Sequence, residues 1–219
     1  MQAGGLAVAA QVCDIRDEDA VNRLFDFVIE RFGPLDFLVN NAGGQFPQAA
    51  LDMSSKGWRA VVDTNLTGAW LMMQSAARRW TAQARGGAIV NIVAACGRGM
   101  PGIAHTSAAR AGVINFTKTA AIEWAPHKIR VNCVAPGVVD TAGLEVYPAE
   151  ARARFALANP QKAFGDPWDI AQMVAFLGCD ATKFMTGATV EMDGGGALWG
   201  DLWTIDRPNY FAPSAGVDS

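Results

Sequence analysis

An alternation along the chain constrains the fold most: short apolar runs rich in β-branched residues are followed by longer segments with the period of an α-helix. The runs at 35–40, 88–93 and 129–135 predict buried strands. A first strand is expected at 6–12 and a last one at 189–192. Because strands that alternate with helices are joined by crossovers, the pattern predicts a parallel sheet with helices on both faces, a doubly wound α/β fold.

The segments between these runs are expected to form helices. Apolar residues over 21–32 recur at the spacing of one helix face. A second helix is expected to start near Ser54 and to point Trp58 inward, a third to span about 106–124, and a fourth to follow Asp166. Ligands of such folds bind beyond the carboxyl ends of the strands, so polar residues there are candidates for function.

Composition limits the classes of function. Hydrophobic residues make up 51% of the chain and the net charge is −3, which excludes a disordered chain and the basic surface that nucleic acids require. No run reaches the roughly 18 apolar residues of a membrane span, and the start has no basic leader, so a cytoplasmic protein is expected. The four cysteines form no C-x-x-C pair, so no metal site is expected. Small-molecule substrates and protein partners remain.

Polar clusters follow several of the expected strands. Small residues from Asn40 to Gly43 would let the backbone approach a flat nucleotide. Asp14, at a strand end, can accept a hydrogen bond from an adenine amino group. For Asn40, a hydrogen bond that bridges two strands is an equally good interpretation.

Five motifs in this order make the sequence resemble the short-chain dehydrogenase/reductase family, over nearly the whole chain. They are Cys13-Asp14-Ile15, Asn40-Asn41-Ala42-Gly43, Asn65-Leu66-Thr67-Gly68, Ile89-Val90-Asn91-Ile92 and the run 130–137. Segments 105–113, 115–118 and 123–124 are similar to a narrower branch that includes trans-2-enoyl-CoA reductases and citronellol/citronellal dehydrogenase-like proteins, although the enoyl-CoA reductases have a tyrosine where Ile114 stands. The resemblance implies an oxidoreductase that uses NADP or NAD on an enoyl-CoA or a terpenoid alcohol or aldehyde. It also implies a homo-oligomer, a dimer or a tetramer.

The residues that carry the family's usual chemistry are largely replaced. The resemblance puts Ala94, Thr106 and Arg110 where the family has Ser, Tyr and Lys, and only its Asn remains, as Asn65. A threonine hydroxyl is far less acidic than a phenol and arginine keeps its proton, so Thr106 cannot simply replace Tyr. Asn65, Thr106 and Arg110 are the expected catalytic set, which suits reduction of an activated C=C bond better than alcohol oxidation. His105 is a candidate proton source; the alternative is a loop histidine whose hydrogen bonds are satisfied.

The resemblance also implies a set of cofactor-binding residues. They are Asp14, Asn40, Ala42, Gly43, Arg110, Pro136, Gly137, Val139 and Thr141. Asp14, Asn65, Arg110 and Thr141 are expected to converge around one cavity. A plain strand-ending turn explains Pro136-Gly137 equally well.

Segment 143–163 is expected to be a substrate lid. Its Arg152 and Arg154 either meet an acidic substrate, such as an acyl-CoA phosphate, or are solvated helix charges. The start of the chain is expected to lack the first two strands and the glycine-rich loop of the family, which makes 1–196 a truncated Rossmann-like domain followed by a tail, 197–219.

The expected loss of the glycine-rich loop predicts that the 219-residue chain binds NAD(P) weakly or not at all. It also keeps a second hypothesis open, a non-catalytic family member that serves as an oligomer partner. Tyr210 in the tail is expected at a subunit contact.

Overall fold

The fold is built on one parallel sheet within residues 6–198, the part of the chain described by a computed structural model. Its four strands lie side by side in chain order: β1 (Phe37–Asn40), β2 (Gly87–Ile92), β3 (Ile129–Pro136) and β4 (Thr189–Met192). The prediction of a parallel α/β sheet is confirmed. The subunit contact expected of Tyr210 lies outside the described residues.

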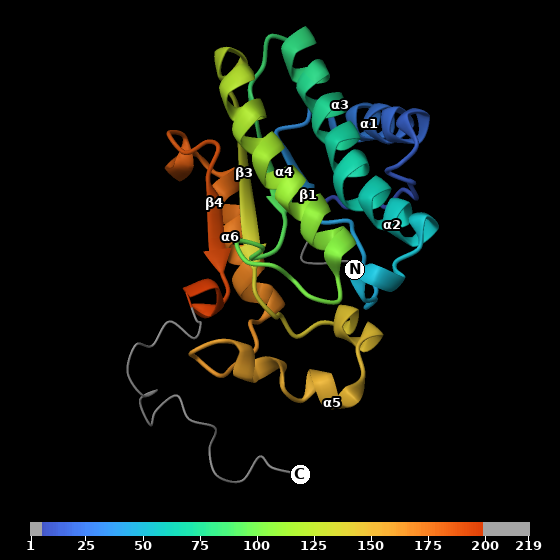
Figure 1. The fold of residues 1–219 in the computed structure, drawn as a ribbon. Helices are drawn as coiled ribbons and strands as arrows, with labels where there is room; N and C mark the ends of the chain where they lie inside the picture. Colours follow the sequence, from blue (N-terminus) through green and yellow to red (C-terminus); the bar gives the residue numbers. More distant parts are fainter. Residues whose placement is uncertain (1–5, 199–219) are drawn as a thin grey trace.

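Helices cover both faces of the sheet. The α-helices of the described residues are α1 (Glu18–Phe32), α2 (Ser55–Val62), α3 (Ala69–Ala82), α4 (Ala104–Glu123), α5 (Ala149–Arg152) and α6 (Pro167–Gly178), with the π-helical segment η2 (Asp63–Gly68) between α2 and α3; the short α5 lies beyond the carboxyl ends of the strands and not on a face of the sheet (Figure 1). Figure 1 shows α3 and α4 in front of the sheet and α6 behind it. None of the helices within 6–198 is both long and apolar enough to cross a membrane.

Local sequence explains where the main helices begin. The side chain of Asp17 accepts hydrogen bonds from two backbone N–H groups of the first turn of α1, and Ser54 does the same for one N–H of α2. Asp166 and Asp169 form a reciprocal capping box at the start of α6. Each cap satisfies N–H groups that a helix leaves without an internal partner.

Side chains of β2 that point to opposite faces of the sheet belong to two separate hydrophobic cores. Ile89 packs with Met73, Trp80 and other residues of α1, α3 and α4, whereas Val90 packs with Leu177 of α6 on the opposite face. Ile89 and Val90 are both fully buried. This two-sided burial explains why the strand is apolar on both faces apart from Asn91.

The expected first strand, 6–12, does not form, and this prediction is wrong. Leu6, Val8 and Val12 are 59–96% exposed instead. A strand is held by hydrogen bonds to a neighbour, and no strand within the described residues lies beside this segment. The outer edge of β1 is likewise unpaired there.

Helical structure from Ser55 to Ala82 confirms the helix expected from Ser54 onward, but the helix type and the side chain that points inward differ. It is interrupted by η2, and Trp58, expected inside, is 40% exposed. The reason is that α2 buries Val61 and packs against α4 and η2, so that Trp58 lies instead at a surface hollow with Ala50.

The carboxyl ends of the strands face a segment that we call the lid, residues 140–164, which includes α5 (Figure 1). The base of the lid is closed by a bridge between Val139 and Gly165. There the N–H of Gly165 donates to the carbonyl of Val138 (2.9 Å) and the N–H of Asp140 donates to the carbonyl of Gly165 (3.0 Å). These hydrogen bonds therefore hold the two ends of the lid together, close to the carboxyl end of β3.

Candidate active site

The loop that follows β1 is joined to two of the predicted catalytic residues. The N–H of Gly44 donates to Oδ1 of Asn65 (3.0 Å), and Nδ2 of Asn65 donates to the carbonyl of Gly44 (2.9 Å). The same Nδ2 donates to Oγ1 of Thr106 (2.9 Å). Asn65 and Thr106 are both buried. Because Oγ1 of Thr106 accepts from Asn65, its own hydroxyl proton is available to another acceptor.

Asn65 owes its position to η2. The segment is π-helical, a rare form that is frequent at functional sites. At its far end a Cβ on Gly68 would lie 2.7 Å from Cγ1 of Ile15, so Gly68 allows the segment after Asp14 to pack against η2. No pattern in residues 63–68 predicts this change from an α-helix to a π-helix.

Arg110 places a cation at the end of β2. Its Nη1 donates to the carbonyl of Ile92 (2.7 Å). Burial lowers the pKa of its guanidinium, against the influence of two nearby cysteine thiols; an arginine nevertheless stays protonated in a protein. A Cβ at position 43 would collide with Nη2 of Arg110, so any larger residue there requires the Arg110 side chain to move. Gly43 and Arg110, both predicted site residues, are therefore in contact.

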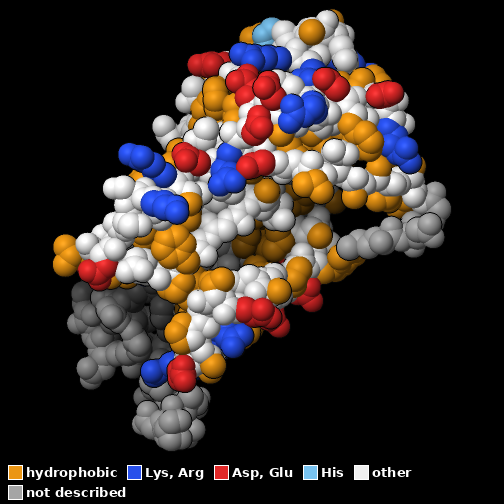
Figure 2. All heavy atoms as spheres, turned by 90° about the vertical axis from the view of Figure 1, so that its right-hand side faces the viewer, with side chains coloured by type: hydrophobic (Ala, Val, Ile, Leu, Met, Phe, Trp, Pro, Cys, Tyr) orange, Lys and Arg blue, Asp and Glu red, His pale blue; other side chains and the backbone are white. Residues whose placement is uncertain are grey.

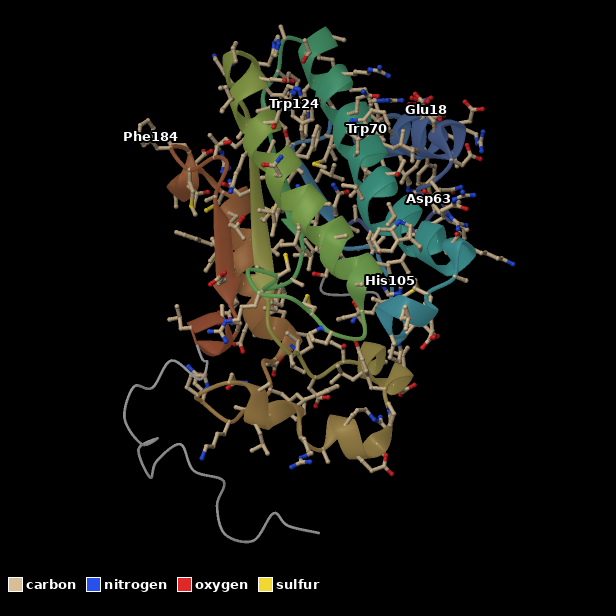
Figure 3. The ribbon with its side chains drawn as sticks, in the orientation of Figure 1. Glu18, Asp63, Trp70, His105, Trp124 and Phe184 are labelled. Atoms are coloured by element: carbon tan, nitrogen blue, oxygen red, sulfur yellow. The ribbon has the colours of Figure 1, made fainter. Side chains whose placement is uncertain are left out.

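His105 lies at the start of α4, on the side of the lid (Figure 3). The alternative interpretation, which placed His105 in a loop, is wrong on this point. It is fully buried, and its Nδ1 accepts a hydrogen bond from the N–H of Thr106 (2.7 Å). The neutral ring therefore carries its hydrogen on Nε2, which has no hydrogen-bond partner within 6–198. Burial lowers the pKa of His105, opposed by the backbone of Ile103 and Phe46. One nitrogen is thus satisfied and the other is not.

The lid reaches the same loop through a tyrosine. Nε2 of Gln45 donates to Oη of Tyr147 (2.6 Å), and the Tyr147 ring meets Phe155 edge to face at 5.2 Å between centroids. Phe46 in turn meets the His105 ring in the same way at 4.6 Å. Sequence reasoning missed these contacts, because they join segments far apart in the chain.

Four consecutive residues of this loop, 43–46, thus contact Arg110, Asn65, Tyr147 and His105 in turn. Figure 2, seen from the side of α1 and α2, shows the molecule hollowed below them, with hydrophobic side chains visible inside. We call loop 43–46 with Asn65, Thr106 and Arg110 the rim cluster.

Thr141 lies elsewhere, in a hollow of the lid of about 430 Å³. The lining residues are Asp140, Thr141, Ala142, Leu144, Glu145, Ala149, Arg152 and Phe164. Two carboxylates and one guanidinium thus share the hollow with apolar side chains.

Asp14 is engaged by a neighbour. Its carboxylate accepts from Nε (2.9 Å) and Nη2 (2.7 Å) of Arg16 and from the Arg16 backbone (3.0 Å). These hydrogen bonds lower the pKa of Asp14 to about 2. Of the four residues expected to converge, Asn65 and Arg110 therefore lie together in the rim cluster, whereas Asp14 and Thr141 make their contacts outside it.

The other predicted cofactor residues serve visible structural roles. Nδ2 of Asn40 donates to Oδ1 of Asn91 (2.8 Å), which is the strand-bridging hydrogen bond of the alternative interpretation. The N–H of Gly137 extends the ladder to β4 by donating to Met192 (3.0 Å), directly after Pro136. Val139 forms the bridge at the base of the lid, and Ala42 is exposed beside Gly43.

A profile of the family described as Enoyl-(Acyl carrier protein) reductase matches residues 2–196. The chain belongs to the short-chain dehydrogenase/reductase family. It is accordingly an oxidoreductase by family. Within the described residues, no group of His, Cys, Asp and Glu is placed to hold a metal ion.

Similar proteins in the family act on different molecules by name. The chain is 42% identical to cis-4-hydroxycyclohexanecarboxylate dehydrogenase of Sinomonas cyclohexanicum, over 83% of this chain and 74% of the relative. It is 38% identical to a probable 2,4-dienoyl-CoA reductase of Bacillus subtilis, over 86% and 76%. A crystal structure of a short-chain type dehydrogenase/reductase from Mycobacterium marinum is 34% identical with a TM-score of 0.80, over 84% and 73%.

Proposed function

We propose that this short-chain dehydrogenase/reductase is an NAD(P)-dependent reductase of an activated C=C bond, with an enoyl-CoA as substrate in preference to a terpenoid alcohol or aldehyde. The observation that carries the proposal is the rim cluster, in which Asn65 holds the Thr106 hydroxyl and Arg110 supplies a cation, without a phenol. The relative named as a dienoyl-CoA reductase supports the same substrate class.

The rim cluster fits the nicotinamide end of such a cofactor. Gly43 and its neighbour Ala42 are exposed, so a planar group can approach the backbone. Within residues 6–198 the one hydrogen bond of Arg110 is to Ile92, which leaves further donors of its guanidinium for ribose hydroxyls. When bound, a nicotinamide dinucleotide, NADP or NAD, would supply the hydride.

The chain's own residues then handle charge and protons. Hydride addition to an enoyl thioester develops negative charge on the carbonyl oxygen, which the fixed cation of Arg110 stabilises. Asn65 is held by Gly44 on one side and positions the Thr106 hydroxyl, which can donate a hydrogen bond to a substrate oxygen or to an ordered water. The proton that completes the reduction at the α carbon then comes from solvent water, and Thr106 keeps its own proton. The Gln45–Tyr147 contact holds the lid over this region and limits access of water.

The test is oxidation of reduced NADP or NAD by the 219-residue chain with crotonyl-CoA and with citronellal; the cofactor is supplied in large excess because weak cofactor binding is expected. We expect turnover of crotonyl-CoA, and a loss of about a hundredfold in kcat for Arg110→Gln, the scale for removing one oxyanion donor. Arg85→Gln is the matched control, because Arg85 pairs with Asp36 at the opposite end of the sheet (2.6 Å). Equal rates for the two variants, or turnover of citronellal alone, would contradict the proposal.

A second candidate is a non-catalytic member that serves as an oligomer partner. Two observations favour it: Thr106 and Arg110 replace the usual Tyr and Lys, and large apolar side chains on α6 are exposed, Trp168 by 70% and Phe176 by 50%. Under this hypothesis the chain turns over neither substrate and has an oligomeric mass in solution. A monomeric mass would exclude this candidate.

A further inference from the structure

The two lid arginines, alike in sequence, have different surroundings. Arg154 is exposed, whereas Arg152 lines the lid hollow and is half-buried. Nε of Arg152 is buried and has no hydrogen-bond partner within the described residues. A buried donor without an acceptor is unfavourable, and native proteins rarely retain one without a reason.

The carboxylates of the same hollow do not supply that partner. Asp140 and Glu145 are both exposed to solvent, and neither forms an ion pair with Arg152 among the salt bridges within 6–198. Within the described residues the guanidinium of Arg152 is therefore a cation without an ion-pair partner, and it carries a planar fork of donors. Such a fork matches the two oxygens of a carboxylate or a phosphate.

The rest of the wall indicates what such an anion is attached to. Leu144, Ala149 and Phe164 provide apolar surface beside Arg152. Thr141 borders the same hollow, and the lid that contains it is joined to the rim cluster by Tyr147. A substrate with an apolar body and one oxyanion beside Arg152 would satisfy the apolar wall and the guanidinium, while the carboxylates of Asp140 and Glu145 stay exposed to solvent.

We infer that Arg152 binds an oxyanion, a carboxylate or a phosphate, of the substrate in the lid hollow. The inference rests on the proposed function and narrows it: a thioester that carries phosphates, or a substrate with a carboxylate, fits the hollow, and a neutral terpenoid alcohol or aldehyde does not. Arg154 has no part in binding.

Ligand-observed NMR on the full chain tests this without turnover. The probes are crotonate, coenzyme A and the neutral crotonamide, and the variants are Arg152→Gln and the matched Arg154→Gln. We expect Arg152→Gln to weaken binding of crotonate or coenzyme A about tenfold, the lower end of the range for a lost charge-assisted hydrogen-bond pair. Arg154→Gln leaves it unchanged, and crotonamide binding is the same in all three proteins.

The two anionic probes distinguish a carboxylate from a phosphate as the group that Arg152 binds. Loss confined to crotonate assigns Arg152 to a carboxylate, and loss confined to coenzyme A assigns it to a phosphate. Arg152→Lys keeps the positive charge but loses the planar pair of guanidinium donors. We expect it to bind the anion more tightly than Arg152→Gln and less tightly than the wild type. Equal affinity of wild type and Arg152→Gln for both anions would overturn the inference.

Kinetics distinguish this failure from failure of the proposed function. If the wild type reduces crotonyl-CoA and Arg152→Gln has the same KM, the proposed function stands and the inference fails. If the wild type reduces no thioester but Arg152→Gln loses anion binding, the inference stands and the proposed function fails. For a phosphate contact, the KM effect should vanish with the N-acetylcysteamine thioester of crotonate, which has no phosphate.

Discussion

Asn91 in the middle of the sheet and Arg152 in the lid both carry buried polar atoms, but only Asn91 has a partner for each. Its Oδ1 accepts from Asn40, and its Nδ2 donates to Oγ1 of Thr117 (2.9 Å) and lies 3.2 Å from Sδ of Met73. Arg152 has a buried Nε with no partner within residues 6–198. A closed network of this kind stabilises the fold, whereas an open donor beside a hollow points to a ligand.

Asn91→Leu should have the largest effect on stability. The substitution leaves Oγ1 of Thr117 and the Asn40 amide without their main partner in the core, so we expect the free energy of unfolding to fall by about 3 kcal/mol. Urea denaturation measures it. Asn115→Leu, on the exposed face of α4, is the control and should change it by less than about 0.5 kcal/mol. A loss below about 1 kcal/mol for Asn91→Leu would show that the network is not the stabilising element.

Gly43→Ala should have the next largest effect, because a Cβ there collides with Arg110 and comes within 2.9 Å of Oδ1 of Asn65. We expect a loss of about 1–2 kcal/mol in unfolding free energy, together with reduced turnover as Arg110 is displaced. Gly44→Ala is a close control, since a Cβ at that position meets no atom within 4 Å. Similar behaviour of the two variants would contradict the close packing in the rim cluster.

Tyr147→Phe keeps the ring against Phe155 and removes only the hydrogen bond from Gln45. We expect a loss of about 1 kcal/mol or less in global stability, but faster tryptic cleavage after Arg152 and Arg154 as the lid opens more often. A double-mutant cycle with Gln45→Ala measures the coupling between the two residues. Additive effects on cleavage would mean that the two side chains do not hold the lid together.

His105 gives the smallest expected effect, a pH dependence. Because burial lowers its pKa in the folded state, the unfolded chain binds the proton more readily. The stabilisation is complete above the unfolded pKa of about 6.5 and is lost as pH falls toward the lower folded pKa.

Urea titrations at pH 7.5 and 5.5 test this, with Asp14 ionised at both values because its pKa is about 2. His105→Gln should remove part of the decline in stability, and His127→Gln, at the other histidine of the chain, should leave the decline in place. An unchanged decline in His105→Gln would assign it to other groups.

Repeating patterns allowed the sheet and most helices to be predicted. Strands such as 129–135 are short apolar runs between helical segments, and caps such as Ser54 and Asp166 mark helix starts with their own side chains. The segment 6–12 has the same local pattern yet forms no strand, because pairing depends on a neighbour that local sequence does not show.

The site was less predictable. The set of Asn65, Thr106 and Arg110 was implied by the family resemblance, but the contacts of Gln45 and Phe46 depend on chain segments brought together by folding. Arg152 and Arg154 are equivalent in the sequence, and only the packing of the lid separates a half-buried donor from an exposed charge.

The bridge between Val139 and Gly165 offers a practical use. The bridge holds together the two positions at which the lid leaves the body of the domain and returns to it. The length and sequence of the residues between them can therefore be varied while the strands of the sheet keep their register. Grafting another lid between these two positions, with position 147 kept as tyrosine to meet Gln45, is therefore a route to new substrate preference on an unchanged redox scaffold.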